Sequence, residues 1–597
     1  MADDSQSTPL SGSSFYKALD FHKVGLIIGL IVFVAIVLAP HPASMDRSGY
    51  NELTSRLPDE TLVRIDNEFG PVNEDNFREF LDYSKTIRVA TGSTSPRFIT
   101  EEAYHALDDT SSFKSPTTLY ELIKGQGRAQ MRVLALALLM AIWWITEAVP
   151  VPLTALLPMV LLPMLCVCNF RYAVYPGYFS AFEQYAHYLI FLFLGGFVIA
   201  AAMRRWGLDK RISLTILSIF GTKPSRIVLG FMVSTAFLSM WISNTATTAL
   251  MMPVALAVLT QAKVRPGESG FGLGLMLSIA YAASIGGIGT LIGTPPNGIA
   301  AGFISQFVGK EVTFASWMRI GLPLVVIFLP IAWRYILWRC PPETTELEGG
   351  KNVIKDNLGK LGALSRGEKN TLVVFLITAV LWATRSSIII GDTTIIIGWS
   401  TWFGGYFSWV HDSTVSILAV ILLFLLPVNF RSATFTIDWK SVEKYVPWGT
   451  LLLFGGGLTL GQAVANTGMA SWVASYLTML SSVPIIVLLL AIVALSALLS
   501  EVTSNTGTAS MLMPVMFALG TAMGRDPSAF MITAAVATSL VFMLPVATPP
   551  NAIVFGTGYV KIDKMAKTGI FLDMIGIIVW TLVLYFIVGK FFGIVVI

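Results

Sequence analysis

Charged side chains are scarce in this sequence. Asp, Glu, Lys and Arg make up 13% of its 597 residues, hydrophobic residues make up 54%, and the mean hydropathy is +0.70. An average soluble domain is roughly 25% charged, so the composition excludes an ordinary soluble fold. Apolar runs of near membrane-spanning length recur along the chain and predict an all-α, multi-pass membrane protein with about 11 transmembrane helices.

Cysteine and histidine are also rare. The three cysteines, Cys166, Cys168 and Cys340, lie in or beside apolar segments and indicate neither a disulfide framework nor a zinc site. The five histidines show no metal-ligand spacing, so we interpret them as structural or surface residues. The sequence contains no nucleophile–base pair and no phosphate-binding loop. We therefore expect neither an enzyme nor a cofactor, and nothing suggests a nucleic-acid partner.

Polar sequence is concentrated near the N-terminus. Residues 1–23 are predicted to form a disordered cytoplasmic tail. Residues 24–40 are apolar, and because acidic residues precede them we expect a retained first transmembrane helix rather than a cleaved signal peptide. Residues 42–128 carry 15 acidic and 10 basic side chains, and we expect an extracytoplasmic insertion. A small folded unit and an unstructured loop are both compatible with it.

The remainder of the chain contains a repeated motif. Residues 243–253 return as residues 504–514, with six of eleven positions identical, and each copy begins with Ser-Asn-Thr. A Thr-Pro-Pro-Asn sequence follows each copy, at 294–297 and 548–551. Each Ser-Asn-Thr interrupts an apolar stretch whose two halves are short for a membrane span. We therefore predict two re-entrant hairpins, over 227–262 and 483–523.

The charges beside the two hairpins differ. Lys and Arg are dense in the loops around the first hairpin and nearly absent around the second until Arg525. The positive-inside rule then gives the hairpins opposite orientations across the membrane. An inverted repeat explains this pattern, with halves over 131–339 and 370–597 joined by a cytoplasmic linker over 340–369.

The repeated motifs have the chemistry of an ion site. Thr is a good N-cap and Pro is favoured in the first helical turn, so each Thr-Pro is expected to restart a helix within the bilayer. Ser and Asn at the hairpin tips are expected to cap the returning helices. Each helix start carries about half a positive charge, so four of them complement a dianion. The tip side chains can hydrogen-bond its carboxylates; they are Ser243, Asn244, Thr245, Ser504, Asn505 and Thr506.

No Lys or Arg lies within the motifs to neutralise such an anion. Mobile cations can supply the missing charge, and hydroxyl, amide and freed carbonyl oxygens are hard ligands suited to Na⁺. A single Ser-Asn-Thr in an apolar helix is more often a capped kink or a packing contact. The duplication at a fixed spacing favours a site instead.

At these motifs the chain resembles the divalent anion:sodium symporter (DASS) family, whose members carry dicarboxylates, citrate and sulfate. The resemblance covers 24–40 and 131–597 and includes Trp143–Pro150, both Ser-Asn-Thr tips, both Thr-Pro-Pro-Asn sequences and the Phe454–Gly457 run. It implies a homodimer in the membrane lipid, in which each protomer has a scaffold domain and a transport domain that moves as an elevator. The intact tips look most like those of bacterial C4-dicarboxylate carriers, which implies a bacterial cell (inner) membrane.

The resemblance also implies site residues. One sodium site would lie at Ser239, Ser243, Asn244 and Gly293, and a second at Ser500, Thr503, Asn505 and Ala547. The substrate contacts would be Ser243, Asn244, Thr245, Thr294, Pro295, Ser504, Asn505, Thr506, Thr548 and Pro549. The leading hypothesis is Na⁺-coupled symport of succinate, malate or fumarate. The alternatives are a Na⁺-independent dicarboxylate exchanger, a citrate or sulfate carrier of the same fold, and a receptor that binds its ligand through 42–128.

Overall fold

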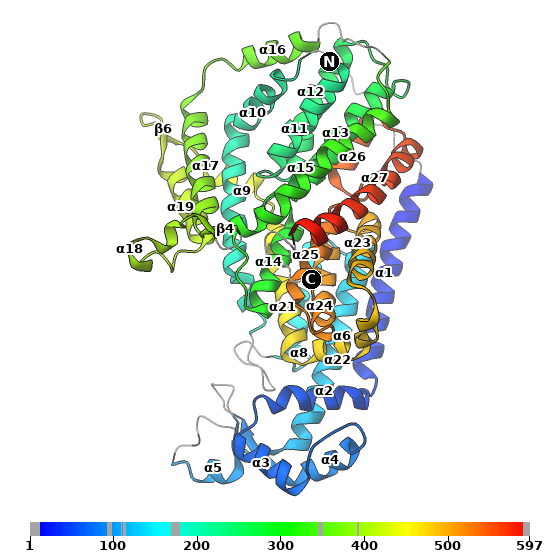
Figure 1. Cartoon of the computed structure of the whole chain (residues 1–597), viewed down its shortest axis with the longest axis vertical. Helices are drawn as coiled ribbons and strands as arrows, with labels where there is room; N and C mark the ends of the chain where they lie inside the picture. Colours follow the sequence, from blue (N-terminus) through cyan, green and yellow to red (C-terminus); the bar gives the residue numbers. More distant parts are fainter. Residues whose placement is uncertain are drawn as a thin grey trace. The chain divides into compact units, whose positions relative to one another are not determined.

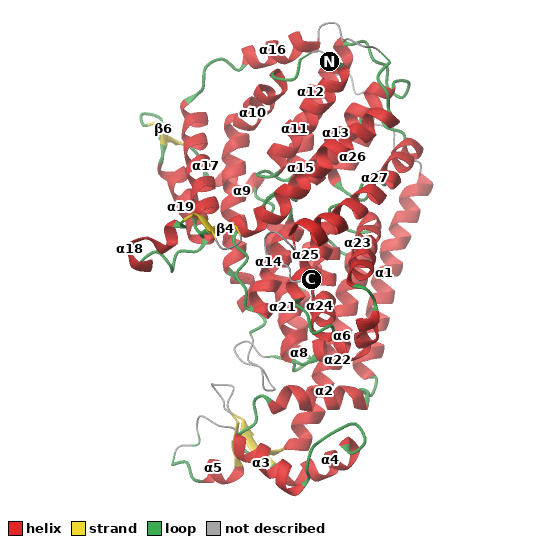
Figure 2. Cartoon of the chain, in the orientation of Figure 1, coloured by secondary structure: helices red, strands yellow, loops and turns green. Residues whose placement is uncertain are grey.

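The computed structural model describes residues 12–91, 98–108, 110, 115–168, 180–221, 223–343, 350–390 and 393–588. These residues are mostly helical, and the strands among them are short (Figure 2). In the described part of the chain, seven helices are long and apolar enough to cross a membrane, or eight if the bent pair His22–Leu38 and Ala43–Thr54 forms one span. The shorter apolar helices Val151–Met164, Pro224–Ser239, Asp412–Leu425 and Pro527–Ala537 add to these.

The chain divides into two compact units, which are described separately. The first contains Met1–Tyr185 and Gly455–Tyr476, and the second contains Ala186–Phe454 and Leu477–Ile597 (Figure 1). The helix α21 (Trp448–Asn466) begins in the second unit and ends in the first.

In the first unit, α1 (Gly12–Leu38) packs along α6 (Leu119–Thr146). Gly25 and Gly29 allow this close approach, because a side chain at either position would collide with Thr146 or Trp143. The α6 helix begins inside the segment that we had assigned to the insertion. Its start is set by Thr118, which forms a capping box with Glu121.

The described part of 42–128 is folded. An antiparallel sheet with strand order β2-β1-β3 packs with short helices around a core that includes Leu53, Phe80 and Ile123. Of the two alternatives for this segment, the structure therefore shows a small folded unit. Its elements are α2 (Ala43–Thr54), α3 (Asp59–Glu68), α4 (Phe77–Tyr83), η1 (Ser84–Thr86), β1 (Arg88–Thr91), β2 (Phe98–Thr100), α5 (Glu101–His105) and β3 (Thr117–Thr118).

The insertion is tied to the end of α21 within the first unit. Gln130 Nε2 donates to the Thr467 carbonyl at 2.8 Å, and Ser48 Oγ donates to the Gly468 carbonyl at 3.0 Å. Gly468 has a φ of 77°, a left-handed conformation that ends the helix at low cost. The remaining elements of this unit are α7 (Val151–Thr154), α8 (Leu157–Met164), η2 (Glu183–Ala186) and most of α22 (Met469–Leu477).

The second unit holds both repeated motifs. Its elements before the linker are α9 (Tyr188–Trp206), α10 (Leu208–Ser218), α11 (Pro224–Ser239), α12 (Asn244–Gln261), α13 (Gly270–Gly287), α14 (Pro295–Phe303), η3 (Ile304–Val308) and α15 (Phe314–Arg339). Those from the linker to α21 are α16 (Gly350–Lys360), α17 (Arg366–Thr384), β4 (Ile388–Ile390), β5 (Thr393–Ile396), η4 (Trp399–Thr401), α18 (Trp402–Gly405), α19 (Asp412–Leu425), β6 (Pro427–Asn429), β7 (Thr434–Phe435) and α20 (Trp439–Tyr445). The last are η5 (Thr478–Ser482), α23 (Ile485–Val502), α24 (Asn505–Ala522), α25 (Pro527–Ala537), α26 (Pro549–Phe555), α27 (Ile562–Leu582) and η6 (Val583–Val588).

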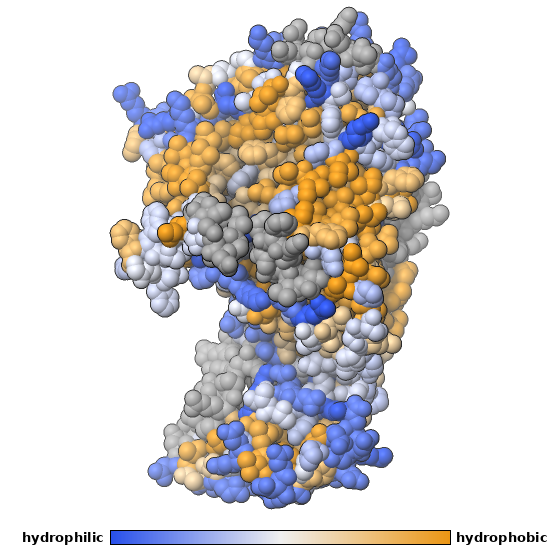
Figure 3. Space-filling model, in the orientation of Figure 1, coloured by the Kyte–Doolittle hydropathy of each residue, from blue (hydrophilic) through white to orange (hydrophobic). Residues whose placement is uncertain are grey.

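Apolar side chains cover the outside of this unit around α15 and α27 (Figure 3). Val326 of α15 and Phe571 and Ile578 of α27 are all more than half exposed. A soluble protein rarely exposes a contiguous apolar surface of this kind. We interpret it as the lipid-facing surface.

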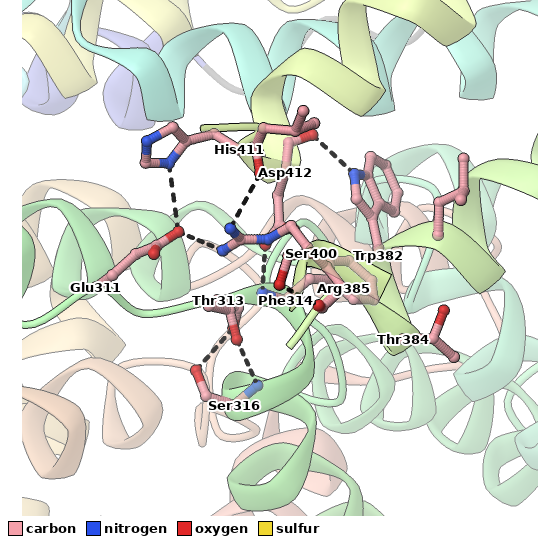
Figure 4. Close-up of polar contacts among 12 residues, drawn as sticks. Glu311, Thr313, Phe314, Ser316, Trp382, Thr384, Arg385, Ser400, His411 and Asp412 are labelled. Atoms are coloured by element: carbon pink, nitrogen blue, oxygen red, sulfur yellow. Dashed lines mark hydrogen bonds and ion pairs between the residues drawn. The ribbon is translucent and has the colours of Figure 1, made fainter. Parts of the chain in front are cut away.

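An ion network anchors the loop before α15 (Figure 4). Arg385, at the end of α17, is buried and pairs with Asp412 at 2.6 Å and with Glu311. The second Asp412 oxygen accepts the Phe314 N–H at 2.8 Å. One buried arginine therefore connects α17, α19 and the start of α15. Neither motif nor spacing in the sequence indicated this network.

Candidate functional site

The two hairpin tips have nearly the same local structure. Asn244 is the first residue of α12 and Asn505 the first of α24, and Ser243 and Ser504 are their N-caps. The Ser243 hydroxyl accepts the Ala246 N–H at 3.4 Å, so the expected side-chain cap forms in the first hairpin. It does not form at Ser504. The Ser504 hydroxyl is therefore not used for capping.

Both Thr-Pro sequences restart a helix, as expected. A break over 288–294 separates α13 from α14, with Thr294 as N-cap and Pro295 as the first helical residue. A break over 538–548 separates α25 from α26 in the same way, with Thr548 as N-cap. Thr548 Oγ1 accepts the Asn551 N–H at 3.3 Å, whereas the Thr294 hydroxyl makes no such bond.

The two helices on either side of each break pack against different hairpins. Before the first break, α13 packs against α11 and α12, and after it α14 packs against α24. Before the second break, α25 packs against α23 and α24, and after it α26 packs against α12. Each break therefore lies where the chain passes from one hairpin to the other. Both irregular segments and both tips belong to the second unit.

The residues expected at the first sodium site lie together. The Ser239 hydroxyl is 2.6 Å from Asn244 Oδ1 and 2.7 Å from the Ala283 carbonyl oxygen. A β-carbon at Gly293 would lie 3.0 Å from the Ser239 carbonyl oxygen, and one at Gly287 would lie 2.5 Å from Asn244 Oδ1. Only glycine leaves room for these two close approaches. Gly287 and Gly293 are therefore both needed for the first break to pack against the tip.

The second site repeats this arrangement. The Ser500 hydroxyl is 2.9 Å from Asn505 Oδ1 and 2.8 Å from the Thr538 carbonyl oxygen. Thr503 contacts Thr508 and the Leu499 carbonyl. Ala547 lies further along the break and donates its N–H to the Leu544 carbonyl at 3.3 Å. The structure thus joins Ser500 to Asn505 directly and places Ala547 on the adjoining break.

These contacts leave acceptor capacity for a cation. A hydroxyl has one hydrogen, so Ser239 can satisfy only one of its two neighbouring oxygens, and the same holds for Ser500. Each tip therefore gathers a hydroxyl, an amide and a backbone carbonyl oxygen with a lone pair to spare. Such hard oxygens suit Na⁺.

Two buried amide oxygens point to the same chemistry. Asn297 Nδ2 donates to the Gly287 and Thr290 carbonyls, and Asn551 Nδ2 donates to the Leu544 carbonyl. Both side chains are fully buried, and within the described structure neither Oδ1 has a hydrogen-bond partner. Each of these oxygens therefore keeps a lone pair that could accept a further bond. Asn297 and Asn551 end the two Thr-Pro-Pro-Asn sequences, so the repeat could have identified them. We assigned them no role from the sequence.

The expected substrate residues differ in accessibility. Ser243, Asn244, Ser504, Asn505 and Thr506 are partly exposed, and Thr245 and Pro549 are exposed. Pro295 is partly exposed, and Thr294 and Thr548 are buried. The tip residues are therefore more accessible than Thr294 and Thr548, the N-caps of α14 and α26.

Glu501 and Asp573 meet at the second break. Glu501 accepts N–H bonds from Phe542 and Met543, each at 2.8 Å, and from Leu544 at 3.1 Å. Asp573 Oδ1 accepts from Phe542 at 2.9 Å. Glu501 lies three residues before Ser504 in the sequence, beside the second tip. Asp573 was missed, because it lies in α27, far from either motif.

Comparisons with known proteins identify the family of this chain. The family described as the sodium:sulfate symporter transmembrane region matches residues 119–595. The sodium-dependent dicarboxylate transporter SdcS of Staphylococcus saprophyticus is 42% identical over 473 residues, which covers 77% of this chain and 87% of that protein. SdcS of Staphylococcus aureus is 41% identical over 473 residues, covering 77% and 86%. The solved YdaH transporter of Alcanivorax borkumensis has a TM-score of 0.45 at 14% identity, covering 69% of this chain and 86% of that one.

Proposed function

The chain belongs to the sodium:sulfate symporter family, the divalent anion:sodium symporters, and from this premise we propose that it is a multi-pass bacterial membrane protein that carries C4-dicarboxylates into the cell together with Na⁺. Succinate, malate and fumarate are the expected substrates. The observation that supports this most directly is the crossing of both broken helices between the two Ser-Asn-Thr hairpins. It gathers polar tips and helix starts in one unit.

The dicarboxylate is held at these tips and helix starts. Helix N-termini present free N–H groups and partial positive charge to an anion. The hydroxyls and amides of Ser243, Asn244 and Thr245, and of Ser504, Asn505 and Thr506, hydrogen-bond the carboxylates at either end of the substrate. Thr294, Pro295, Thr548 and Pro549 supply the two interrupted helix starts.

Sodium completes the binding site. One ion binds at Ser239, Ser243, Asn244 and Gly293, and the other at Ser500, Thr503, Asn505 and Ala547. The oxygen clusters around the Ser239 and Ser500 hydroxyls support both assignments. Because the cations bring the charge that the anion needs, substrate and Na⁺ move together. Each surplus positive charge that enters adds about 2.3 kcal/mol of driving force per 100 mV.

Membership of this family also leads us to propose the domain architecture and the mode of transport. The two halves form an inverted repeat, the hairpins are re-entrant, and a transport domain moves against a scaffold as an elevator within a homodimer. The matching contacts of Ser239 with Asn244 and of Ser500 with Asn505 support the repeat. The uneven distribution of Lys and Arg, dense around the first hairpin and nearly absent around the second until Arg525, supports its inversion.

Uptake of labelled succinate into proteoliposomes tests the proposal. An inward Na⁺ gradient should drive accumulation, and an equal choline gradient should not. Accumulation that ignores Na⁺ but rises when vesicles are preloaded with dicarboxylate would identify an exchanger instead. Competition by sulfate or citrate stronger than that by malate would identify a carrier of those anions.

A further inference from the structure

We propose that Glu501 and Asp573 are positioning residues that set the Na⁺ affinity of the second cation site. This inference rests on the proposed function, because it assumes that Na⁺ binds at Ser500 and Asn505. Neither carboxyl group is among the expected ligands. They act through the backbone of the second break.

The two side chains clamp three consecutive peptide groups. Glu501 extends from the end of α23, is only 2% exposed, and accepts the N–H groups of Phe542, Met543 and Leu544. Asp573 reaches the Phe542 N–H from α27. Hydrogen bonds to carboxylates are stronger than those between neutral groups. Three hydrogen bonds to Glu501 and one to Asp573 together fix a segment that has no regular secondary structure.

The clamp also decides where the carbonyl groups of the break point. A trans peptide is planar, so its N–H and C=O point in opposite directions. With the three N–H groups turned toward Glu501, the carbonyls of the same peptide groups are turned away from it. Ser500 is adjacent to Glu501 and contacts both Asn505 Oδ1 and the Thr538 carbonyl. The clamp is therefore only one residue away in the chain from the Ser500 hydroxyl and its two oxygen neighbours.

The neighbouring helix is shaped to support this clamp. Gly569 lies one turn before Asp573 on α27, and a β-carbon there would be 2.1 Å from the Phe542 carbonyl oxygen. Any larger residue would push α27 away from the break. The close approach brings the Asp573 carboxyl group within reach of the Phe542 N–H.

The first half lacks these carboxyl groups. Met240 occupies the position that corresponds to Glu501, and its backbone carbonyl accepts the Thr290 hydroxyl. The N–H groups of Ile288, Gly289 and Gly293 bond instead to nearby carbonyls. Among the described residues, the first break therefore has no counterpart of the Glu501 clamp at Met240. We infer that the second site carries the stronger negative potential and binds Na⁺ more tightly.

Glu501→Gln tests the inference, because it keeps the side-chain shape and removes the charge. Succinate uptake is measured against Na⁺ concentration, together with the Na⁺-dependent rise in unfolding temperature of the purified protein in choline-balanced buffer. We expect the half-saturating Na⁺ concentration to rise at least about tenfold, because hydrogen bonds to a neutral amide replace bonds to a charged group. The succinate KM at saturating Na⁺ should stay within about twofold of wild type, since the lost interaction concerns the cation.

Three further variants separate positioning from general stability. Asp573→Asn keeps an acceptor for Phe542 and should raise the half-saturating Na⁺ concentration by less. Glu501→Asp keeps the charge on a shorter side chain and should retain more Na⁺ affinity than Glu501→Gln. Glu368→Gln, the matched control, alters a buried carboxylate that pairs with Arg211, and should leave the Na⁺ dependence unchanged.

The outcomes distinguish this inference from the proposed function. A wild-type protein without Na⁺ dependence would contradict the proposed function itself. A Na⁺-dependent wild type with unchanged Na⁺ dependence in Glu501→Gln would overturn only the inference. The inference also fails if Glu368→Gln shifts the Na⁺ dependence equally. It fails too if neither Glu501→Gln nor Asp573→Asn folds while Glu368→Gln does, because the role would then be structural.

Discussion

The two helix breaks satisfy their backbone N–H groups with different partners. The first break and its borders contain Gly286, Gly287, Gly289 and Gly293, and its N–H groups bond to neighbouring carbonyls. The second break, over 538–548, contains no glycine, and carboxyl groups from two other helices accept the N–H groups of Phe542, Met543 and Leu544. The comparison teaches that a duplicated site can keep its Ser-Asn contacts while the backbone support around them diverges.

The largest predicted effect concerns the asparagine at each tip, which contacts a serine hydroxyl in both halves. Asn244→Ala and Asn505→Ala each remove an amide oxygen that contacts a serine hydroxyl. Each should lower succinate uptake at least about 100-fold, because a site whose buried polar groups lose their partner loses several kcal/mol. Uptake by protein that is expressed and monodisperse is the measurement. Comparable loss of folding in both variants would instead make these asparagines structural.

Glycine substitution should affect the first break selectively. Gly287→Ala would place a methyl group 2.5 Å from Asn244 Oδ1 and displace the tip. Succinate uptake should fall at least about tenfold, since overpacking costs roughly 1–3 kcal/mol. Gly359→Ala is the control, because its β-carbon would meet no atom within 4 Å. Equal uptake by the Gly287 variant and wild type would show that the close approach does not matter.

The loops that follow the broken helices also differ. The loop after the first is tied to the Arg385 network, whereas Tyr559 in the loop after the second bonds to the Val264 carbonyl. Asp412→Asn leaves Arg385 without its buried partner. The free energy of unfolding should fall by about 3 kcal/mol, the lower end for breaking a buried pair. Thermal unfolding in detergent measures this, with Lys310→Gln as the control for an exposed pair. An equal loss of stability in both variants would contradict the special role of Arg385.

The smallest effect concerns helix α10, where Asp209 corresponds to Ala470 in the second half. Burial raises the pKa of Asp209 from 3.8 to about 6. A raised pKa in the folded state favours folding below pH 4 and loses that contribution as the pH rises through 6. Asp209→Asn should therefore be more stable than wild type at pH 7.5, by about 1–3 kcal/mol.

The pH dependence of that difference is the measurement. The advantage of Asp209→Asn should vanish below pH 4, where the wild-type side chain is also neutral. Glu368 provides the opposite case: burial alone would raise its pKa, but hydrogen bonds from Arg211 and Ser365 lower it. Glu368→Gln should therefore be less stable than wild type at pH 7.5. A pH-independent difference for Asp209→Asn would exclude the electrostatic explanation.

Local signals in the sequence predicted the helix starts around the candidate site. Ser-Asn-Thr and Thr-Pro encode caps and helix starts through neighbouring residues, so both tips and both breaks could be placed in advance. The start of α6 at Leu119 was misplaced, because a polar helical stretch with a capping box looks like part of a loop when hydropathy is the main guide. The described strands were also unforeseen, since each is only two to four residues long.

Long-range partners could not be predicted in the same way. Asp573 accepts the N–H of Phe542, 31 positions away, and Arg385 pairs with Asp412, 27 positions away. Nothing in their local sequence specifies those partners, because tertiary packing alone brings the elements together. The fold of the insertion was undecided for the same reason: its core joins residues from Tyr50 to Ile123.

Reciprocal binding to the purified protein tests the central claim most directly. If Na⁺ supplies the charge that the substrate needs, succinate must bind more tightly in NaCl than in choline chloride, and Na⁺ must bind more tightly by the same factor when succinate is present. Titration calorimetry in both orders measures the two factors. The account predicts equal factors well above one; succinate affinity that is identical in the two salts would contradict it.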